Sequence, residues 1–238
     1  MDKQLKEQIK HDTFVEQIEN IFEYVTTHKA GVLRNGAIVL AVLLVAGSIY
    51  GFLNWRKNQR QEDLRKASLV LDGIIGVSGP PGAQMFKTQE EKDTAAMKAF
   101  NEVALKHSGS MEGLIARVQA SSQLCDMGKT AECESGLKEA ANGSHAQIAS
   151  VAKVSLVSLY HGQKKLAEAE KLCRELIANP TPLVSKEQAQ ILLVKTIIRS
   201  KPQEARSILE QLQNADRSAV TRAAVGLLGE LNQISPPK

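Results

Sequence analysis

KKLAEAEKLCREL, residues 164–176, is one of four related segments that decide the fold. The others are EKDTAAMKAFNEV at 91–103, GKTAECESGLKEA at 128–140 and SKPQEARSILEQL at 200–212. Each has a lysine, a small residue four places later and a further apolar residue four places after that, a spacing that puts the last two on one helix face. In chain order these residues are Lys92, Ala96 and Phe100; Lys129, Cys133 and Leu137; Lys165, Ala169 and Cys173; and Lys201, Ala205 and Leu209. The chain therefore repeats with a period near 36.

A second helical pattern precedes each of the last three segments, at 111–127, 145–161 and 185–199, and predicts helical hairpins. Short turns rich in Gly, Ser, Asn and Pro separate the hairpins. In the first repeat this helix is displaced upstream to about 58–75, and the glycine-rich stretch 76–88 is predicted to be a flexible loop. Residues 216–232 are predicted to form a closing helix, because the end of a solenoid must be covered.

The repeat pattern resembles the tetratricopeptide repeat, whose unit of 34 residues has A-x3-F near its centre. The agreement is incomplete, since no Trp opens a repeat, the Leu-Gly pair is absent, and only Tyr160 stands where the motif has its Tyr. This resemblance implies a solenoid of helical hairpins with a concave face lined by the first helix of each hairpin.

An apolar run, RNGAIVLAVLLVAGSIYGFLNWRK, occupies residues 34–57. Residues 36–53 carry no charge, and as a helix they are about 27 Å long, close to the ~30 Å hydrocarbon core of a bilayer. A cleaved signal peptide has a shorter apolar core nearer the amino terminus, whereas 35 residues precede the uncharged part of this run. A buried core helix would need partners as apolar as itself, and no other stretch of the chain is as long and as apolar. We therefore expect residues 36–53 to be a retained anchor in the lipid bilayer.

A tail, one span and a helical-hairpin array together resemble the bacterial YfgM-like family, which includes the ancillary subunit of the SecYEG translocon. The expected fold is all-α, with a single transmembrane helix followed by a tetratricopeptide-like solenoid. The expected parts are a tail at 1–28, an anchor at 29–57 and a repeat domain at 58–238. The resemblance implies the bacterial inner membrane, a cytoplasmic amino terminus and a periplasmic repeat domain. It also implies protein partners: the Sec translocon, secreted chains or periplasmic chaperones.

Charge is distributed unevenly, and it leaves the sidedness open. Residues 1–28 have 3 Lys/Arg against 6 Asp/Glu (−3), residues 29–66 have 7 against 2 (+5), and residues 67–238 have 20 against 18 (+2). The body therefore lacks the basic field of a nucleic-acid-binding protein. The cations cluster on the carboxyl side of the span, which by the positive-inside rule favours a cytoplasmic repeat domain. That placement is the alternative to the periplasm.

Two surfaces are predicted to contact proteins. The groove positions of the repeat, carried onto this register, form an apolar face suited to an apolar peptide segment or a partner helix. They are Ile115, Val118, Ser122, Val151, Val154, Ser158, His161, Gln190, Val194 and Ile197. The amino-terminal tail forms an amphipathic helix whose polar side is acidic, which favours docking onto protein over lying on lipid. Its apolar face comprises Phe14, Ile18, Ile21, Phe22 and Val25.

Nothing in the chain predicts catalysis, a metal site or a cofactor. The five histidines are scattered, and no HExxH, nucleophile elbow or phosphate loop occurs. Cys133 and Cys173 occupy repeat core positions, so we interpret them as buried structural thiols. The alternative for Cys133 is a disulfide with Cys125 that would join the two helices of one hairpin.

These observations predict a non-enzymatic, membrane-anchored scaffold that binds proteins near the inner membrane. The alternative is a structural assembly subunit of a membrane complex, in which the tail and the span make the contacts and the groove is idle.

Overall fold

The structure is a computed structural model that describes residues 17–18, 21–23, 26–76, 80, 84–214 and 218–234. It divides into two compact units, residues 1–58 and 59–238. Each unit is described by itself below.

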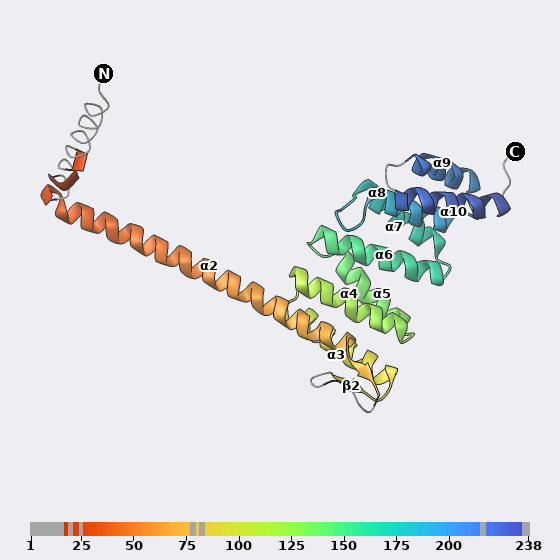
Figure 1. Cartoon of the computed structure of the whole chain (residues 1–238), viewed down its shortest axis with the longest axis horizontal. Coiled ribbons are helices and arrows are strands. Elements are labelled where there is room, and N and C mark those ends of the chain that lie inside the picture. The colour runs from red at the N-terminus through yellow and green to blue at the C-terminus, as the bar shows by residue number, and fades with distance from the viewer. Residues whose placement is uncertain are drawn as a thin grey trace, which may run out of the picture. The chain divides into compact units, whose positions relative to one another are not determined.

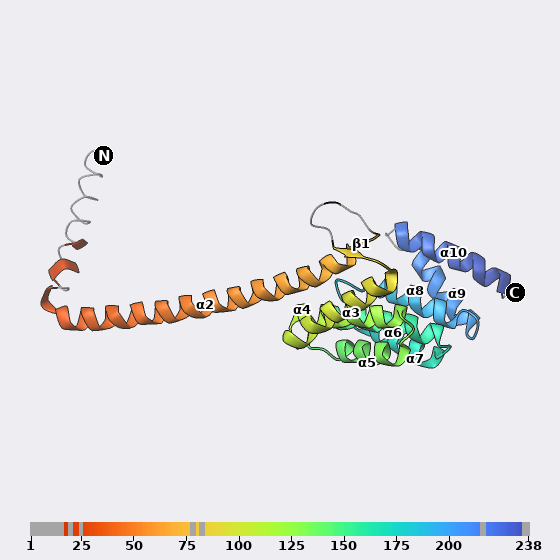
Figure 2. The same ribbon diagram turned by 90° about the horizontal axis from the view of Figure 1, so that it is seen from below.

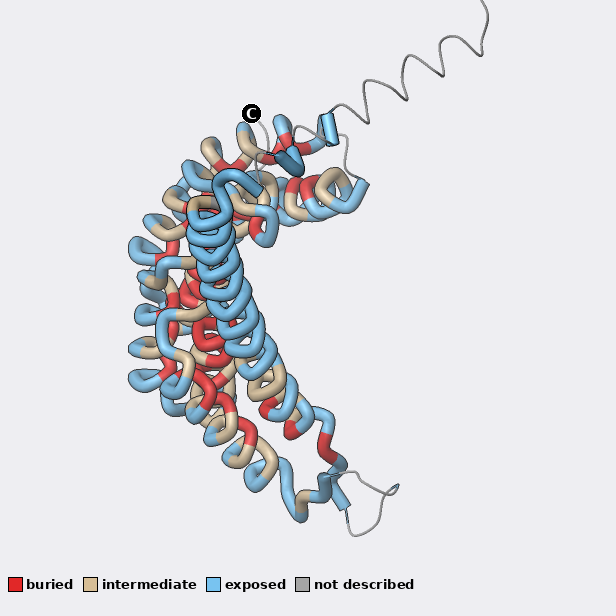
Figure 3. Tube along the Cα trace, turned by 90° about the vertical axis from the view of Figure 1, so that its left-hand side faces the viewer, coloured by how far each residue is buried: buried red, intermediate tan, exposed pale blue. Residues whose placement is uncertain are grey.

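The first unit contains most of the apolar part of helix α2, which extends from Lys29 to Leu71. Among the described residues, α2 is the one helix long and apolar enough to cross a membrane by length and composition, with a mean hydropathy of 2.3 over its most apolar window. None of that window is buried against the rest of the chain. In Figure 3 this part of α2 is accordingly coloured as exposed. It is therefore unlike a core helix, whose apolar side chains are covered by protein.

Ile18, Ile21 and Phe22 of the predicted tail face are exposed. The other two members of that face, Phe14 and Val25, lie outside the described residues.

The second unit is an array of helical hairpins that follows the period of the sequence (Figures 1 and 2). Its helices after α2 are α3 (Gln89–Lys106), α4 (Met111–Asp126), α5 (Thr130–Ala141), α6 (Ala146–Gly162), α7 (Leu166–Ala178), α8 (Lys186–Ile197), α9 (Pro202–Gln213) and α10 (Ser218–Ile234). The hairpins stack into an arc with the buried residues along its interior (Figure 3).

The displaced first helix of the first repeat is the carboxyl-terminal part of α2. Ala67 is buried in one cluster with Phe100 and Val103 of α3 and Ala116 of α4. The helix ends at Leu71, four residues before the predicted end at 75.

Part of the loop expected at 76–88 is ordered differently from the prediction. Two-residue strands β1 (Ile74–Ile75) and β2 (Met85–Phe86) pair in parallel, with the Ile74 N–H donating to the Gln84 carbonyl at 2.8 Å. Gly73 permits this pairing, because a side chain there would overlap the ring of Phe86.

The helix boundaries follow from local chemistry. The hydroxyls of Thr88, Ser110 and Ser185 accept hydrogen bonds from the first turns of α3, α4 and α8 and so cap them. The turns after α4 and α6 both need a residue in the left-handed region, filled by Gly128 (φ 76°) in one and by Lys164 (φ 61°) in the other. Only glycine adopts this conformation without a cost of about 1 kcal/mol or more.

The repeated positions form the core. The small residues Ala96, Cys133, Ala169 and Ala205 are all 0% exposed, so that the two helices of a hairpin approach closely. The apolar residues four places later, Phe100, Leu137, Cys173 and Leu209, are at most 1% exposed. The pattern read from the sequence is therefore the packing pattern of the hairpins.

A final helix covers the last hairpin, as the capping argument required. The closing helix predicted at 216–232 corresponds to α10, which begins at Ser218. Ala224, Leu228 and Leu231 of α10 are buried against the array. Asp216 lies outside the described residues.

Candidate partner-binding face

The predicted groove residues lie on helices α4, α6 and α8, and we refer to the surface of these helices as the α4–α6–α8 face. Three of the ten are not on it. Val118, Val194 and Ile197 are 8%, 0% and 1% exposed and belong to the main hydrophobic core. Their assignment to the groove was wrong. The second helix of each hairpin and the next repeat together cover more of the first helix than we expected when we carried the groove positions of the repeat onto this sequence.

Ile115 and Val151 are partly buried and pack against the core, and Gln190 is also partly buried. They border the face without forming a hollow in it.

The remaining four predicted residues line two adjacent hollows. The larger has a volume of about 510 Å³ and is walled by α4, α5 and α6, with Ser122, Val154 and Ser158 from the predicted set. The smaller, of about 260 Å³, lies between α6 and α8 and includes Ser158 and His161. Because Ser158 lines both, the hollows are neighbours across α6.

Residues that the sequence reasoning missed complete the walls. In the larger hollow they include Leu137, Leu159 and Asp126, which give it an apolar interior with one carboxylate. In the smaller hollow Lys195 and Leu192 come from α8. Leu192 and Lys195 are spaced 3 apart on one side of α8, a pattern visible in the sequence but masked there by the apolar residues around them.

Gln163 also lines the larger hollow, and its side-chain oxygen Oε1 is buried with no hydrogen-bond donor in the described part of the chain. A buried acceptor without a donor is costly, by about 1–3 kcal/mol.

Charges on the second helices of the hairpins are paired between repeats. Lys165 at the start of α7 donates to Glu134 of α5 at 3.3 Å, and Lys201 at the start of α9 donates to Glu170 of α7 at 2.6 Å. Hydrogen bonding from Lys138 holds the pKa of the Glu134 carboxyl below its ordinary value, and Lys201 does the same for Glu170.

The smaller hollow of the α4–α6–α8 face carries a basic side chain that is not in such a pair. Lys195 is exposed, and its ammonium group has neither a carboxylate nor a hydrogen-bond acceptor among the residues described. The exposed ring of His161, in the same hollow, is likewise without a partner in the described ranges. This hollow therefore presents a positive charge that the protein does not neutralise itself.

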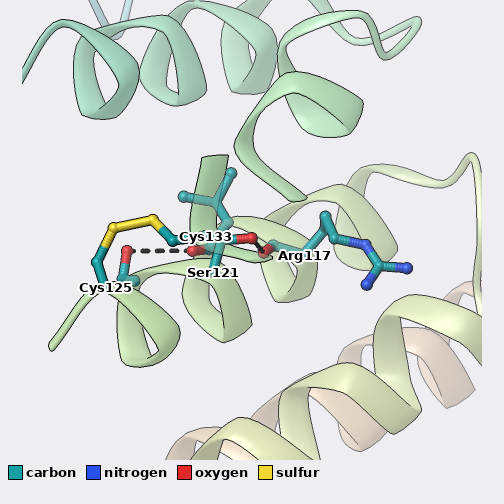
Figure 4. Close-up of a disulfide and its surroundings, with 6 residues drawn as sticks. Arg117, Ser121, Cys125 and Cys133 are labelled. Atoms are coloured by element: carbon teal, nitrogen blue, oxygen red, sulfur yellow. Dashed lines mark hydrogen bonds between the residues drawn. A yellow bond between two sulfur atoms is a disulfide. The ribbon is translucent and has the colours of Figure 1, made fainter. Parts of the chain in front are cut away.

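A disulfide lies at the rim of the larger hollow. Cys125 of α4 and Cys133 of α5 are joined, with their Cα atoms 5.3 Å apart (Figure 4). The interpretation of Cys133 as a free thiol was therefore wrong, although its side chain is buried as expected. Nearby, the buried hydroxyl of Ser121 donates to the Arg117 carbonyl at 2.7 Å. The disulfide fixes the end of α4 against the start of α5.

Cys173 remains a free thiol and is fully buried. Burial raises its pKa to about 11, so it is protonated and unreactive near neutral pH. No group of three or more His, Cys, Asp or Glu side chains in the described ranges is placed to hold a metal ion.

Comparison with known proteins identifies a family. A family model described as a tetratricopeptide repeat-like domain matches residues 33–179, from the amino-terminal part of α2 to the residue that follows α7. The matched region includes α4, α6 and the larger hollow and ends before α8. Comparisons with curated proteins and with solved structures gave no match.

Proposed function

This chain belongs to the tetratricopeptide repeat-like domain family, and we propose that it is a non-enzymatic, membrane-anchored scaffold that binds proteins at the bacterial inner membrane. The observation that carries the proposal is the apolar hollow of about 510 Å³ on the α4–α6–α8 face. Its volume lies within the range of ligand-binding pockets, and its walls are apolar with a few polar groups. Such a hollow suits an apolar side chain of a peptide segment or a partner helix.

Anchoring is supported by the exposed apolar residues of α2, which find no covering partner within the described chain. In the proposed mechanism the anchor holds the binding face close to the membrane, which raises the local concentration of membrane-associated partners. Binding alone is sufficient for this role, without chemistry.

The periplasm is the proposed compartment of the repeat domain. The disulfide between Cys125 and Cys133 supports it, because disulfides form and persist in oxidising compartments such as the periplasm. The cations that follow the span favour the opposite orientation. We weigh the disulfide more heavily, since loop charges bias insertion whereas the cytosol keeps thiols reduced. The proposed partners are secreted chains, periplasmic chaperones or the Sec translocon, as the YfgM-like resemblance implies.

Sidedness is tested with a tag placed after Lys238 and protease added to intact spheroplasts. Digestion of the tag supports the periplasm, and protection until the membrane is opened contradicts it. Alkylation of the unreduced protein in denaturant gives a second test, since the unfolded chain exposes every free thiol and Cys125 and Cys133 then stay unmodified only if they are paired.

The binding face is tested with a photo-reactive amino acid at Ser158, between the two hollows, in the full-length protein in cells. Lys171, exposed on α7, is the matched control position. Adducts with secreted chains or periplasmic chaperones should form from Ser158, disappear with Val154→Asp, and be absent from Lys171. Equal adducts from both positions would contradict a role for this face.

The alternative, a structural assembly subunit, is favoured by the exposed Ile18, Ile21 and Phe22 of the tail. A photo-reactive group at Ile21 distinguishes the two functions. If a membrane-complex subunit is captured from Ile21 and nothing from Ser158, the assembly function is supported and the groove is idle.

A further inference from the structure

We propose that the α4–α6–α8 face selects protein segments that carry an apolar side chain and, about one helix spacing away, an acidic side chain. This inference rests on the proposed function only in requiring that the face binds protein. It adds a sequence preference to the partner, which the family and the apolar character of the groove do not specify.

The apolar part of the preference comes from the larger hollow. Leu137, Val154 and Leu159 contribute apolar side chains to its walls, and the whole hollow has a volume of about 510 Å³. Gln163 belongs to the same wall, with its side-chain Oε1 buried beneath the surface. Apolar side chains are present in most protein segments, so this hollow alone selects weakly.

The acidic part comes from the smaller hollow. The ammonium group of Lys195 is unpaired within the described ranges, whereas several basic side chains elsewhere on the hairpins have carboxylate partners. On the same face, for example, Lys153 of α6 bonds to Glu175 at 2.9 Å. The Lys195 charge is therefore available to a carboxylate of the partner, aided by hydrogen bonding from His161.

The spacing between the two subsites comes from the helices. Ser158 of α6 lines both hollows, so the subsites lie on opposite sides of one helix. Packed helices are about 8–10 Å apart, which an extended segment spans in about three residues. The preferred segment therefore has its acidic side chain about three residues from the apolar one.

The direction of the segment is set by a second charge. Asp126 lines the larger hollow, while Lys195 lies in the smaller one. A carboxylate is therefore repelled at one end of the site and attracted at the other. A segment with its charge reversed, apolar with a lysine three residues on, should be disfavoured at the Lys195 end.

The experiment uses the purified full-length chain in detergent and three fluorescent Ser/Gly peptides, read by anisotropy. One peptide has a leucine and a glutamate three residues on, the second has leucine and lysine, and the third has glutamate without leucine. The leucine–glutamate peptide should bind about fivefold more tightly than the leucine–lysine peptide, as for one partly exposed ion pair. Lys195→Glu should reverse that order, and Lys171→Glu on α7 should leave it unchanged.

Both variants replace exposed lysines, and thermal unfolding checks that they fold like the unaltered chain. Equal binding of the leucine–glutamate and leucine–lysine peptides overturns the acidic preference and leaves the proposed function in place. If none of the peptides binds and Ser158 captures no partner, the binding face itself is wrong and both proposals fail.

Discussion

The hairpins α4–α5 and α6–α7 share one 36-residue pattern but close in different ways. In α4–α5 a disulfide joins Cys125 to Cys133, whereas the equivalent positions in α6–α7 are His161 and Ala169. The α4–α5 turn has Gly128 with a positive φ, and the α6–α7 turn places Lys164 there at a conformational cost. The repeat therefore specifies the topology of every hairpin, while the rigidity of each hairpin depends on its own turn residue and on whether a disulfide closes it.

A second difference is the distance of approach. Gly136 of α5 faces the buried Ser121, and a Cβ added there would overlap the Ser121 hydroxyl. The equivalent residue of α7 is Leu172, which packs against the core. The covalently closed hairpin is thus also packed more closely at this level.

The largest effect is expected from removing the disulfide. Cys125→Ala with Cys133→Ala should lower the free energy of unfolding by about 2–3 kcal/mol, because a bond that closes a loop of eight to nine residues restricts the unfolded chain by roughly that amount. Urea unfolding measures it. Hydrogen exchange should also show α5 protected more than α7 in the oxidised protein, with the difference lost in the variant.

Cys173→Ala is the control for the loss of sulfur alone; because it keeps the disulfide, reductant should lower its stability as it lowers that of the unaltered protein. Equal stability of the double variant and the unaltered protein, or an unaltered protein that is insensitive to reductant, would refute the comparison of the two hairpins.

A smaller effect is expected at Gly136. Gly136→Ala should destabilise the protein by about 1–2 kcal/mol, since overpacking costs about 1–3 kcal/mol and the better helix propensity of alanine returns up to about 1. Ser121→Ala removes the overlapping hydroxyl, so the double variant should recover most of the loss. Urea unfolding of the four proteins measures this coupling.

If Gly136→Ala raises the stability, the helices have room to accept a methyl group, and the close approach of α4 and α5 is not a constraint on the sequence.

The smallest effect, and one expected to be the same in both hairpins, comes from the ion pairs between repeats. Glu134 and Glu170 have folded-state pKa values below their ordinary value of 4.5. A carboxyl with a lowered pKa contributes stability above pH 4.5, and the contribution is lost as the pH falls through the folded-state value. Glu134→Gln and Glu170→Gln should each cost about 0.2–1 kcal/mol at pH 7 and less near pH 3.

Thermal unfolding at the two pH values measures this difference, with Glu210→Gln as the control at an exposed position of α9. A cost that is the same at pH 3 as at pH 7 would show that these side chains act through packing and not through their charge.

The repeated core was predictable from the sequence because burial recurs every 36 residues. Ala96, Cys133, Ala169 and Ala205 were recognised from spacing alone, and the structure buries all of them completely. The helical character of 58–71 was equally visible, since Ala67 and its neighbours form an apolar stripe.

The binding face was less predictable, because spacing gives the side of a helix but not how much of that side its neighbours cover. Val118, Val194 and Ile197 therefore read as groove residues and proved to be core. Lys195 was overlooked because the apolar residues around it mask its spacing from Leu192. The pairing of Cys125 with Cys133 was open because an odd number of cysteines permits several outcomes.

That pairing has a consequence for how the protein is made. Three cysteines allow three possible pairs, and the native one joins neighbours in sequence, eight residues apart. Cys125 and Cys133 emerge together and meet far more often than either meets Cys173, since closing a short loop costs less entropy. Once α7 folds, Cys173 is withdrawn from exchange. The chain can thus acquire its correct bond from an oxidase alone, without an isomerase to repair it.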